Sequence, residues 1–424
     1  MPKVKEMIPM LIPLILMFYF IYPQALSVNG SSFVALAGMV GLGLYAYHRF
    51  PFREVVTALA ALFVLFFIYY SLSWINKAPD GYTIGYFRTQ IAWFFTAYMV
   101  VLSIFKVHKK PTFNTFLLYV VGAITLQSLI TFLMYLNEGI HDFFFSLQMQ
   151  GEYTEEVMNE AGGQRLMGYG IGFFGAGALS GIGLIAASYL LIRMKLSTKG
   201  FVLLVACYVF MFYIGLFMAR TTVVGMALGL VLIAVLYLKD DKSVKKQAKK
   251  FIIASFFLMF AGYIFAMFYF SGFSTWAFEL FTNLFEHGRL ETKSSNGLEE
   301  MLIFPEDLHT IVFGRGDMGF WGSDVGYSRL IFYVGIPGTI FFFLYQFFIT
   351  KLSSTKDWGV NTFALTMVLY TMILNFKGWI DLNFILYSIF FFFVFYKYYI
   401  YYPKIHMEKE FVLPKFKTTV KTTE

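Results

Sequence analysis

Residues 201–238 read FVLLVACYVFMFYIGLFMARTTVVGMALGLVLIAVLYL, two long apolar runs that meet at one charged residue, Arg220. Each run lacks Asp, Glu, Lys and Arg, and each is close to the ~20 residues that cross a bilayer as a helix. A backbone inside lipid must satisfy its own hydrogen bonds, so such runs form helices. The stretch therefore predicts two membrane-spanning helices joined by almost no loop.

The rest of the chain has the same apolar character. Of its 424 residues 58% are hydrophobic and only 14% are charged, whereas soluble domains carry roughly 25% charged residues. A soluble protein is thereby excluded, and an all-α polytopic membrane protein with about twelve spans is predicted. The first span lacks a small-residue cleavage site, so we expect it to be retained. The apolar windows lie at 7–26, 33–48, 55–75, 89–105, 113–136, 168–192, 201–219, 222–238, 251–270, 330–350, 361–376 and 383–400.

Lys and Arg predict the orientation, because cytoplasmic loops are enriched in them. Most of the 33 basic residues fall on one side if both termini are cytoplasmic. Two long loops, 137–167 and 271–329, then lie outside. Residues 1–402 form one domain embedded in the cytoplasmic membrane, and 403–424 form a basic cytoplasmic tail. The net charge of +8 is confined to particular loops, so no nucleic acid partner is expected.

Some basic residues lie on the outer side, against the orientation rule. Four of these arginines each lie at the outer end of a different helix that is predicted to run inward. Unpaired N–H groups and the positive end of the helix dipole lie at such an end. Arginine binds two phosphate oxygens with its planar fork, so four such ends in one bundle are expected to hold a pyrophosphate. Anchoring to the phosphates of the outer leaflet is the alternative for each. The four are Arg88, Arg165, Arg220 and Arg329.

Arg220 favours the phosphate interpretation most strongly. Its short connection places it near membrane depth, where charged side chains usually face the protein interior and mark a site. Arg165 begins RLMGYGIGFFGAGALSGIG, a span with seven glycines. Gly177 and Gly181 have the spacing of close helix packing, which would bring Arg165 near neighbouring helix ends.

Residues 313–330, FGRGDMGFWGSDVGYSRL, gather polar residues and five glycines in a mostly apolar chain. The glycines permit a tightly turned loop that carries Arg315. Ser323 or Asp324 could cap a helix that begins near Gly326. Asp324 is equally a candidate for catalysis.

Three blocks of the chain resemble bacterial O-antigen and capsular polysaccharide polymerases, which share their architecture with the O-antigen ligases. The blocks are RLMGYG at 165–170, ARTT at 219–222 and SDVGYSRLIFYVGIPG at 323–338, the last being the most specific. Lys377, in NFKGWI, resembles a polar position at the same place in such proteins.

The resemblance implies that residues 1–402 are a catalytic domain of a membrane glycosyltransferase. A growing glycan on undecaprenyl diphosphate would pass to a lipid-linked repeat unit at the outer face of the cytoplasmic membrane. No metal or cofactor is implied, and the sequence has no cluster with metal-ligand spacing. The implied partners are the undecaprenyl-diphosphate-linked oligosaccharide, the bilayer, and a chain-length regulator and flippase of the same pathway.

The resemblance also implies roles for particular residues. Arg165, Arg220 and Arg315 would hold the diphosphate, and Arg329 and Lys377 would support them. Arg88 is a further candidate for the diphosphate because of its predicted position at a helix end. The implied catalytic residues are Arg220, Arg315, Asp324 and His309. The base that takes the acceptor's proton would be Asp324, His309 or Glu306. Ligases place a histidine in the large loop, for which His287 and His309 are available, although a surface position is the alternative for both.

Two rival functions remain open at the level of sequence. An O-antigen ligase would share the donor and differ in its acceptor. A lipid-linked oligosaccharide flippase or transporter belongs to another class. Transporters place ionisable groups near the bilayer midplane, and the predicted spans carry none in their central portions.

Overall fold

The computed structural model describes residues 4–28, 31–48, 53–78, 81–149, 165–239, 242–289 and 292–401. These residues are helical apart from their connections and one short antiparallel pair, β1 (Ser27–Val28) and β2 (Ser31–Ser32). The first helices are α1 (Val4–Ile21), η1 (Pro23–Ala25), α2 (Phe33–His48), α3 (Arg53–Ile75), α4 (Gly81–Val107), α5 (Phe113–Leu136), α6 (Glu138–Leu147) and α8 (Phe173–Arg193). The others are α9 (Thr198–Met218), α10 (Thr222–Lys239), α11 (Lys242–Tyr269), α12 (Ser271–Ala277), α13 (Glu279–His287), α14 (Lys293–Glu300), α15 (Leu308–Phe313), α16 (Gly326–Leu352), α17 (Trp358–Leu374), α18 (Asn383–Phe395) and η2 (Tyr396–Tyr401).

Eight helices in the described part of the chain are long and apolar enough to cross a membrane, namely α3, α4, α5, α8, α9, α10, α11 and α16. Four shorter apolar helices, α1, α2, α17 and α18, occupy the other windows expected from the sequence. An all-helical, multi-pass membrane protein is thereby confirmed. The count of twelve spans and the cytoplasmic termini stay predictions.

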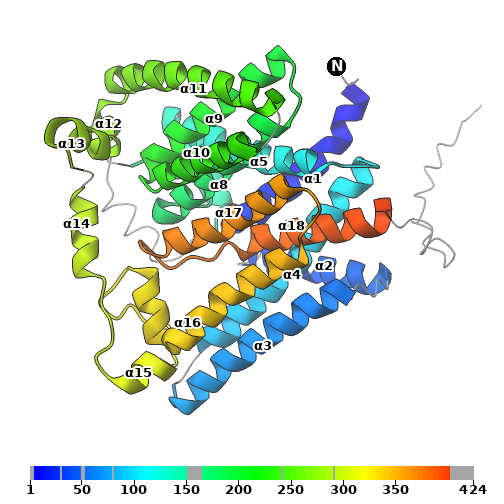
Figure 1. The fold of residues 1–424 in the computed structure, drawn as a ribbon, viewed down its shortest axis with the longest axis vertical. Coiled ribbons are helices and arrows are strands. Elements are labelled where there is room, and N and C mark those ends of the chain that lie inside the picture. The colour runs from blue at the N-terminus through cyan, green and yellow to red at the C-terminus, as the bar shows by residue number, and fades with distance from the viewer. Residues whose placement is uncertain are drawn as a thin grey trace, which may run out of the picture.

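Helix α8 is the centre of one group of helices, seen above and to the left in Figure 1. Nearly all of its residues are buried, and it packs against α5, α9, α10 and α11. A Cβ on Gly225 of α10 would meet the backbone of Gly181, and one on Gly177 would meet Thr221. The close helix packing predicted from these glycines is confirmed.

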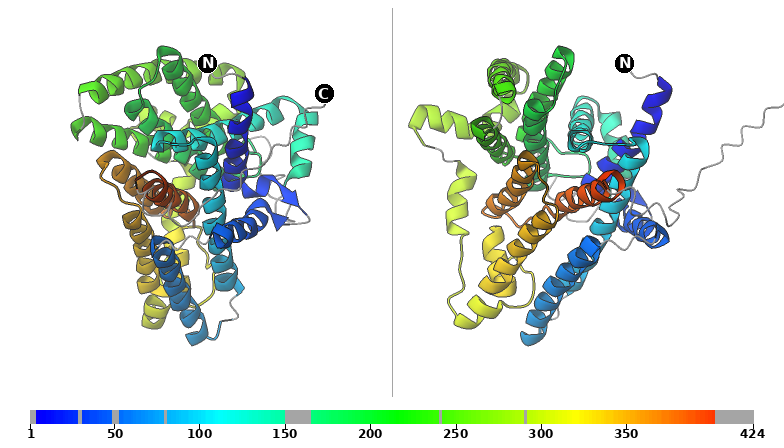
Figure 2. Two further views of the ribbon diagram at one scale, coloured as in Figure 1. Left: turned by 90° about the vertical axis from the view of Figure 1, so that its right-hand side faces the viewer. Right: turned by 45° about the vertical axis from the view of Figure 1, so that its right-hand side comes forward.

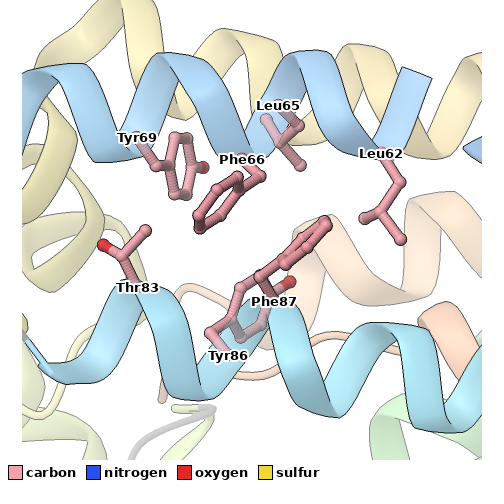
Figure 3. Close-up of a pocket in the computed structure, with 7 residues that line it drawn as sticks. All are labelled: Leu62, Leu65, Phe66, Tyr69, Thr83, Tyr86 and Phe87. Atoms are coloured by element: carbon pink, nitrogen blue, oxygen red, sulfur yellow. The ribbon is translucent and has the colours of Figure 1, made fainter. Parts of the chain in front are cut away.

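A second group holds α3, α4, α16 and α18 (Figures 1 and 2). Helix α3 packs against α4 and α16, and α18 packs against α4 and α16. A small cavity of about 10 Å³ lies between α3 and α4, lined mostly by rings and leucines (Figure 3). It has room for roughly one water molecule.

Helix α16 bends sharply at Gly335, whose φ of 68° and ψ of 179° only glycine adopts readily. Pro337 lacks an N–H and cannot bond the carbonyl of Tyr333. The 313–330 loop supplies the missing donors: the Gly316 N–H donates to the Tyr333 carbonyl (3.0 Å), and the Arg315 N–H donates to the Phe332 carbonyl (2.7 Å). The bend thus fixes the backbone of the loop that carries Arg315.

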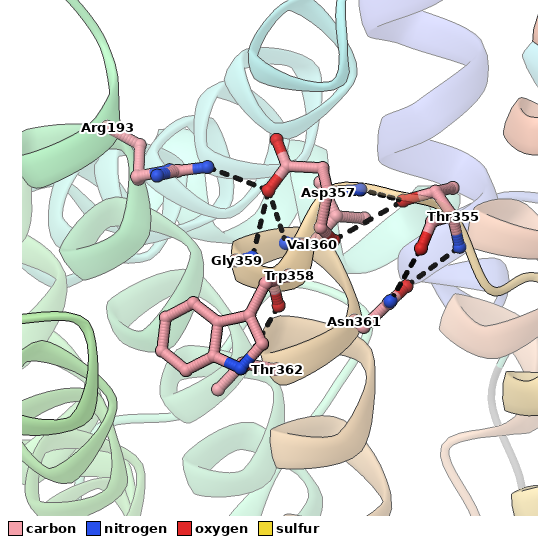
Figure 4. Close-up of polar contacts among 8 residues, drawn as sticks. All are labelled: Arg193, Thr355, Asp357, Trp358, Gly359, Val360, Asn361 and Thr362. Atoms are coloured by element: carbon pink, nitrogen blue, oxygen red, sulfur yellow. Dashed lines mark hydrogen bonds and ion pairs between the residues drawn. The ribbon is translucent and has the colours of Figure 1, made fainter. Parts of the chain in front are cut away.

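The C-terminal end of α8 carries an ion pair. The Nη2 of Arg193 lies 2.7 Å from Oδ1 of Asp357, which also accepts the Gly359 N–H at 2.8 Å and so caps α17 (Figure 4). An open cleft of about 220 Å³ lies beside this pair. In the predicted topology this end faces the cytoplasm.

The two long connections fold in part. The predicted loop 137–167 begins with α6, and its acidic TEEVMNEA segment lies outside the described residues. The predicted loop 271–329 contains the short helices α12, α13, α14 and α15. Helix α12 packs back onto α9 and α11, so this loop reaches the membrane helices.

Candidate functional site

Three cations that the sequence singled out lie together in the structure: Arg165, Arg220 and Lys377, called here the cation cluster. The indole ring of Trp276 lies between the two guanidinium groups, with each Cζ 4.5 Å from the ring centroid. Burial, together with the nearby charges of Arg220 and Arg165, lowers the pKa of Lys377 to about 8. All three positive charges are therefore within electrostatic reach of one another.

Three separate connections bring these cations together. Arg165 precedes a turn closed by a bridge between Gly168 and Ile171, and the neighbouring Leu166 N–H donates to the carbonyl of Phe217, near the end of α9 (3.1 Å). Arg220 lies in the short turn between α9 and α10. Lys377 lies just after α17, where its N–H donates to the Leu374 carbonyl at 2.9 Å.

Arg220 is only partly neutralised by its neighbours. Its Nη2 lies 2.6 Å from Oε2 of Glu279, and its side chain is 9% exposed. Its Nε and Nη1 are buried and have no hydrogen-bond partner among the described residues, and neither do the hydroxyls of Thr221 and Thr222 beside it. Leaving buried donors unpaired is costly, so these groups are placed to receive a ligand that can accept hydrogen bonds.

The cation cluster keeps an excess of positive charge. Glu279 pairs with Arg220, whereas the described residues provide no ion pair for Arg165 or Lys377. Burial and the charge of Arg220 lower the pKa of Arg165. Holding like charges close together costs free energy, which a bound anion would recover.

Local backbone strain accompanies this arrangement. Phe173, the first residue of α8, has a φ of 48°, which residues other than glycine rarely adopt. Its ring lies 5.7 Å from Cζ of Arg165. Strained residues of this kind persist where the surrounding structure requires them, often at functional sites.

The N-terminus of α16 begins beside the Lys377 connection. The Tyr327 N–H donates to the Asn375 carbonyl at 3.1 Å, and a Cβ on Gly326 would lie 2.7 Å from the Gly378 carbonyl. Helix α10 begins two residues after Arg220. The positive ends of these helix dipoles add to the field of the cation cluster.

Two predicted cations are held in the 313–330 loop. Arg315 is exposed, and its Cζ lies 4.5 Å from the centroid of Trp321 and 5.0 Å from that of Phe332. The Nε of Arg329 donates to the Gly319 carbonyl at 3.2 Å. Among the described residues, these contacts of both arginines are with this loop and α16, and none of them is with the cation cluster.

Arg88 is exposed on α4. The prediction that it lies at a helix N-terminus is wrong, because α4 begins at Gly81. The apolar window at 89–105 starts after Arg88 because it contains no charged residue. A membrane helix can still include an arginine on its outer face, because the long side chain carries its charge toward water.

The candidate bases from the sequence, Asp324, His309 and Glu306, are all exposed, as is His287. His309 contacts the ring of Phe313 at 5.3 Å. The predicted side-chain cap on α16 is wrong, since the N-cap is Val325 and no side chain caps the helix. The Ser323 hydroxyl instead donates to the Met301 carbonyl and accepts the Val325 N–H.

The structure adds three residues that the sequence reasoning missed. Trp276 and Glu279 belong to an aromatic segment, and nothing in the nearby sequence indicates that this segment contacts the arginines. Asp381, in GWIDLN, was detectable as an acidic residue between two apolar windows. Burial raises the pKa of its carboxyl group.

The described residues contain no group of three side chains suited to hold a metal ion. No protein-family model, no curated protein and no solved structure matches the chain.

Proposed function

We propose that this chain is a polysaccharide polymerase, a membrane glycosyltransferase that uses a glycan linked to undecaprenyl diphosphate as its donor. The observation that carries the proposal is Arg220, nine-tenths buried in the cation cluster, with two guanidinium nitrogens that no described residue pairs. A diphosphate has several oxygens that accept such hydrogen bonds and balance the charge. The resemblance of the 323–338 block to polymerases supports the same donor.

The cation cluster fits the chemistry of this transfer. As the bond from the anomeric carbon to the diphosphate breaks, negative charge grows on the leaving diphosphate. Preorganised cations in a water-poor pocket stabilise that charge more than they stabilise the intact donor. The nearby anion also favours the charged form of Lys377, so all three cations would act together.

The predicted topology places the cation cluster at the outer face of the cytoplasmic membrane. Lipid-linked repeat units would reach it within the outer leaflet, and the growing glycan would extend away from the membrane. A flippase that delivers the repeat units and a chain-length regulator are the partners that this location requires.

The test uses purified full-length protein and the lipid-linked oligosaccharides that accumulate in cells from which its gene is deleted. Wild-type protein is expected to produce a ladder of longer glycans. Arg220→Ala is expected to lower the rate roughly 100-fold or more, the effect of removing one transition-state donor. Arg193→Ala, at the opposite end of α8, is the matched control and should retain the wild-type rate.

Other outcomes identify the rivals. Transfer only to a different acceptor would indicate a ligase, and lipid movement across the bilayer without any product would indicate a flippase. Arg315→Ala, tested in parallel, determines whether the 313–330 loop acts in the same reaction. A wild-type ladder from Arg220→Ala would overturn the assignment of the donor site.

A further inference from the structure

A second cluster of polar side chains begins four residues after Lys377, in the same connection. We call it the Asp381 cluster. Oδ2 of Asp381 lies 3.1 Å from Nε2 of Gln90, Oδ1 accepts the Asn383 N–H at 3.2 Å, and the hydroxyl of Tyr86 also hydrogen-bonds to the carboxylate. These groups come from α4 and from the beginning of α18, so the cluster joins the two helices.

The hydrogen bonds around Gln90 fix its orientation. Its Oε1 accepts from Nδ2 of Asn383 at 3.1 Å and from the hydroxyl of Tyr387 at 2.9 Å. Nε2 is therefore the atom that points to Asp381, because the amide oxygen is already used. Tyr387 is held in turn by the hydroxyl of Tyr345 at 2.8 Å. The carboxylate thus has preset donors on one side.

Aromatic rings form a wall next to the carboxylate. Tyr82 and Tyr86 are stacked, with centroids 6.0 Å apart and an interplanar angle of 14°. The ring of Trp379 lies 6.3 Å from that of Tyr86, and its Nε1 donates to the Tyr82 hydroxyl at 2.8 Å. Rings of this kind present an apolar face together with a polar edge. A sugar ring is complementary to such a wall, because its C–H groups can pack on the aromatic faces and its hydroxyls can hydrogen-bond to the polar groups.

Asp381 is surrounded by protein but keeps some accessible surface, as do Lys377, Trp379 and Tyr86. The described residues give the carboxylate no cationic partner. A deep carboxylate without such a partner is costly to maintain. An amide in place of Asp381 could link α4 and α18 at a lower free-energy cost than a carboxylate. A structural role alone therefore does not explain the carboxylate.

We propose that the Asp381 cluster binds the terminal sugar of the incoming repeat unit, and that Asp381 accepts the proton of the attacking hydroxyl. This inference rests on the proposed function and assigns its acceptor side. The site combines a carboxylate, two amides and an aromatic wall, and it continues from the cation cluster along one short stretch of chain.

The reaction step balances without any further reagent. The proton of the acceptor hydroxyl passes to the Asp381 carboxylate as the oxygen forms its bond to the anomeric carbon of the donor. The bond from that carbon to the diphosphate breaks, and its electron pair leaves with the diphosphate. The cation cluster holds the leaving group. A carboxyl whose pKa is raised by burial is a better proton acceptor than an exposed one.

The main test is Asp381→Asn, which keeps the size and polarity of the side chain. With the same lipid-linked oligosaccharides, we expect chain extension to fall by about 100-fold or more, the usual contribution of a general base. Binding of undecaprenyl diphosphate, followed as a thermal shift in detergent, should stay at the wild-type level because the donor site is untouched. Asp357→Asn, the same substitution at the opposite end of α8, is the control and should extend normally.

A second variant keeps the inference testable if Asp381→Asn does not fold. Tyr86→Phe removes only the hydroxyl that stabilises the charged carboxylate. The pKa of Asp381 should then rise, so the acidic limb of the pH–rate profile should move to higher pH. The other titratable groups around Asp381 are the phenols of Tyr69, Tyr82, Tyr345 and Tyr387, and a phenol ordinarily titrates at about pH 10, far from the acidic limb. Lys377, four residues away along the chain, has a pKa of about 8 and acts on the alkaline side.

The outcomes separate the two proposals. A wild-type rate in Asp381→Asn, or an unmoved acidic limb in Tyr86→Phe, would overturn the acceptor assignment while the donor site stands. Failure of the wild-type protein to extend any of these lipids would overturn both proposals. Lost extension with retained lipid binding in Asp381→Asn supports the assignment.

Discussion

Arg220 shows how a single residue can be positioned for an exchangeable partner. Glu279 fixes one nitrogen of the guanidinium and Trp276 supports its face, while the described part of the chain leaves two nitrogens unpaired. A fully paired arginine would be part of the scaffold. Partial pairing combines a fixed geometry with unused donors, as binding of an exchangeable anion requires.

Trp276 separates two guanidinium groups that would otherwise repel each other. Each cation–π contact contributes roughly 0.5–1 kcal/mol, so Trp276→Ala is expected to weaken binding of undecaprenyl diphosphate about tenfold. Trp276→Phe should recover part of the affinity, since a smaller ring remains. Titration of the lipid in detergent measures both. Equal affinity in wild type and Trp276→Ala would contradict this role.

Lys377 predicts a pH dependence of donor binding. Its pKa of about 8 means that it carries a charge below that pH and loses it above. Affinity for undecaprenyl diphosphate should therefore decline as the pH rises through about 8. The folding stability of the unliganded protein should change with pH in the opposite direction. Between this pKa and the ordinary pKa of lysine, the unfolded chain binds a proton that the folded protein does not, so stability rises with pH.

The control for this prediction is Lys377→Met, which has no titrating group. Its affinity should be lower at neutral pH and should change little across the same range. If wild type and Lys377→Met show the same decline, another group is responsible.

The sequence identified part of the site for a clear reason. Arg165, Arg220 and Lys377 stand out because they interrupt apolar runs on the side that disfavours positive charge. Trp276 and Glu279 do not, because their role depends on a long loop folding back onto α9 and α11. Asp381 stands out between two apolar windows, but no local pattern links it to Gln90.

At the scale of elements, the bend in α16 connects helix geometry to the 313–330 loop. The carbonyls released by Gly335 and Pro337 are paired by that loop, so the bend and the position of Arg315 are one structural unit. A straight α16 would leave the loop without its main attachment.

Gly335→Ala should destabilise the protein. The left-handed φ and the nearby Val312 carbonyl both oppose a Cβ there, and strain of this type costs about 1–3 kcal/mol. The midpoint of thermal unfolding in detergent is expected to fall. Gly43→Ala is the control: it lies in α2 with open space around it, and the helix should gain slightly from alanine.

Helix α17 depends on Asp357 at its start. Asp357→Ala removes the cap and the ion pair with Arg193, and the lost cap should cost about 1 kcal/mol. Glycan extension should keep its wild-type rate at low temperature, because the cation cluster lies at the other end of α8. A loss of extension without a loss of stability would show that this end of the molecule takes part in the reaction.

At the scale of the whole molecule, apolar windows were sufficient to locate the membrane helices, because lipid forces each long run into a helix. The short helices α12, α13, α14 and α15 were not predicted, because their sequences are mixed and their packing is set by distant partners. Two helices also begin at other residues than their predicted windows: α4 begins before its charge-free window, and α8 begins after a turn at Gly168.

The predicted topology can be tested with the single cysteine, Cys207. In a Cys207→Ser background, an impermeant maleimide applied to spheroplasts should label Lys77→Cys, between α3 and α4. It should not label Lys195→Cys, between α8 and α9, until the membrane is permeabilised. The reverse pattern would invert the orientation and place the cation cluster at the cytoplasmic face.

The residues of the cation cluster come from connections that lie far apart along the chain. A ribosome therefore synthesises the helices from α8 to α17, and the translocon inserts them, before the turn with Lys377 can reach Arg165 and Arg220. Until then the nascent chain has only part of the charge that we propose holds a lipid carrier. Products of interrupted translation should thus be inert, and they would not sequester a carrier that the cell must recycle.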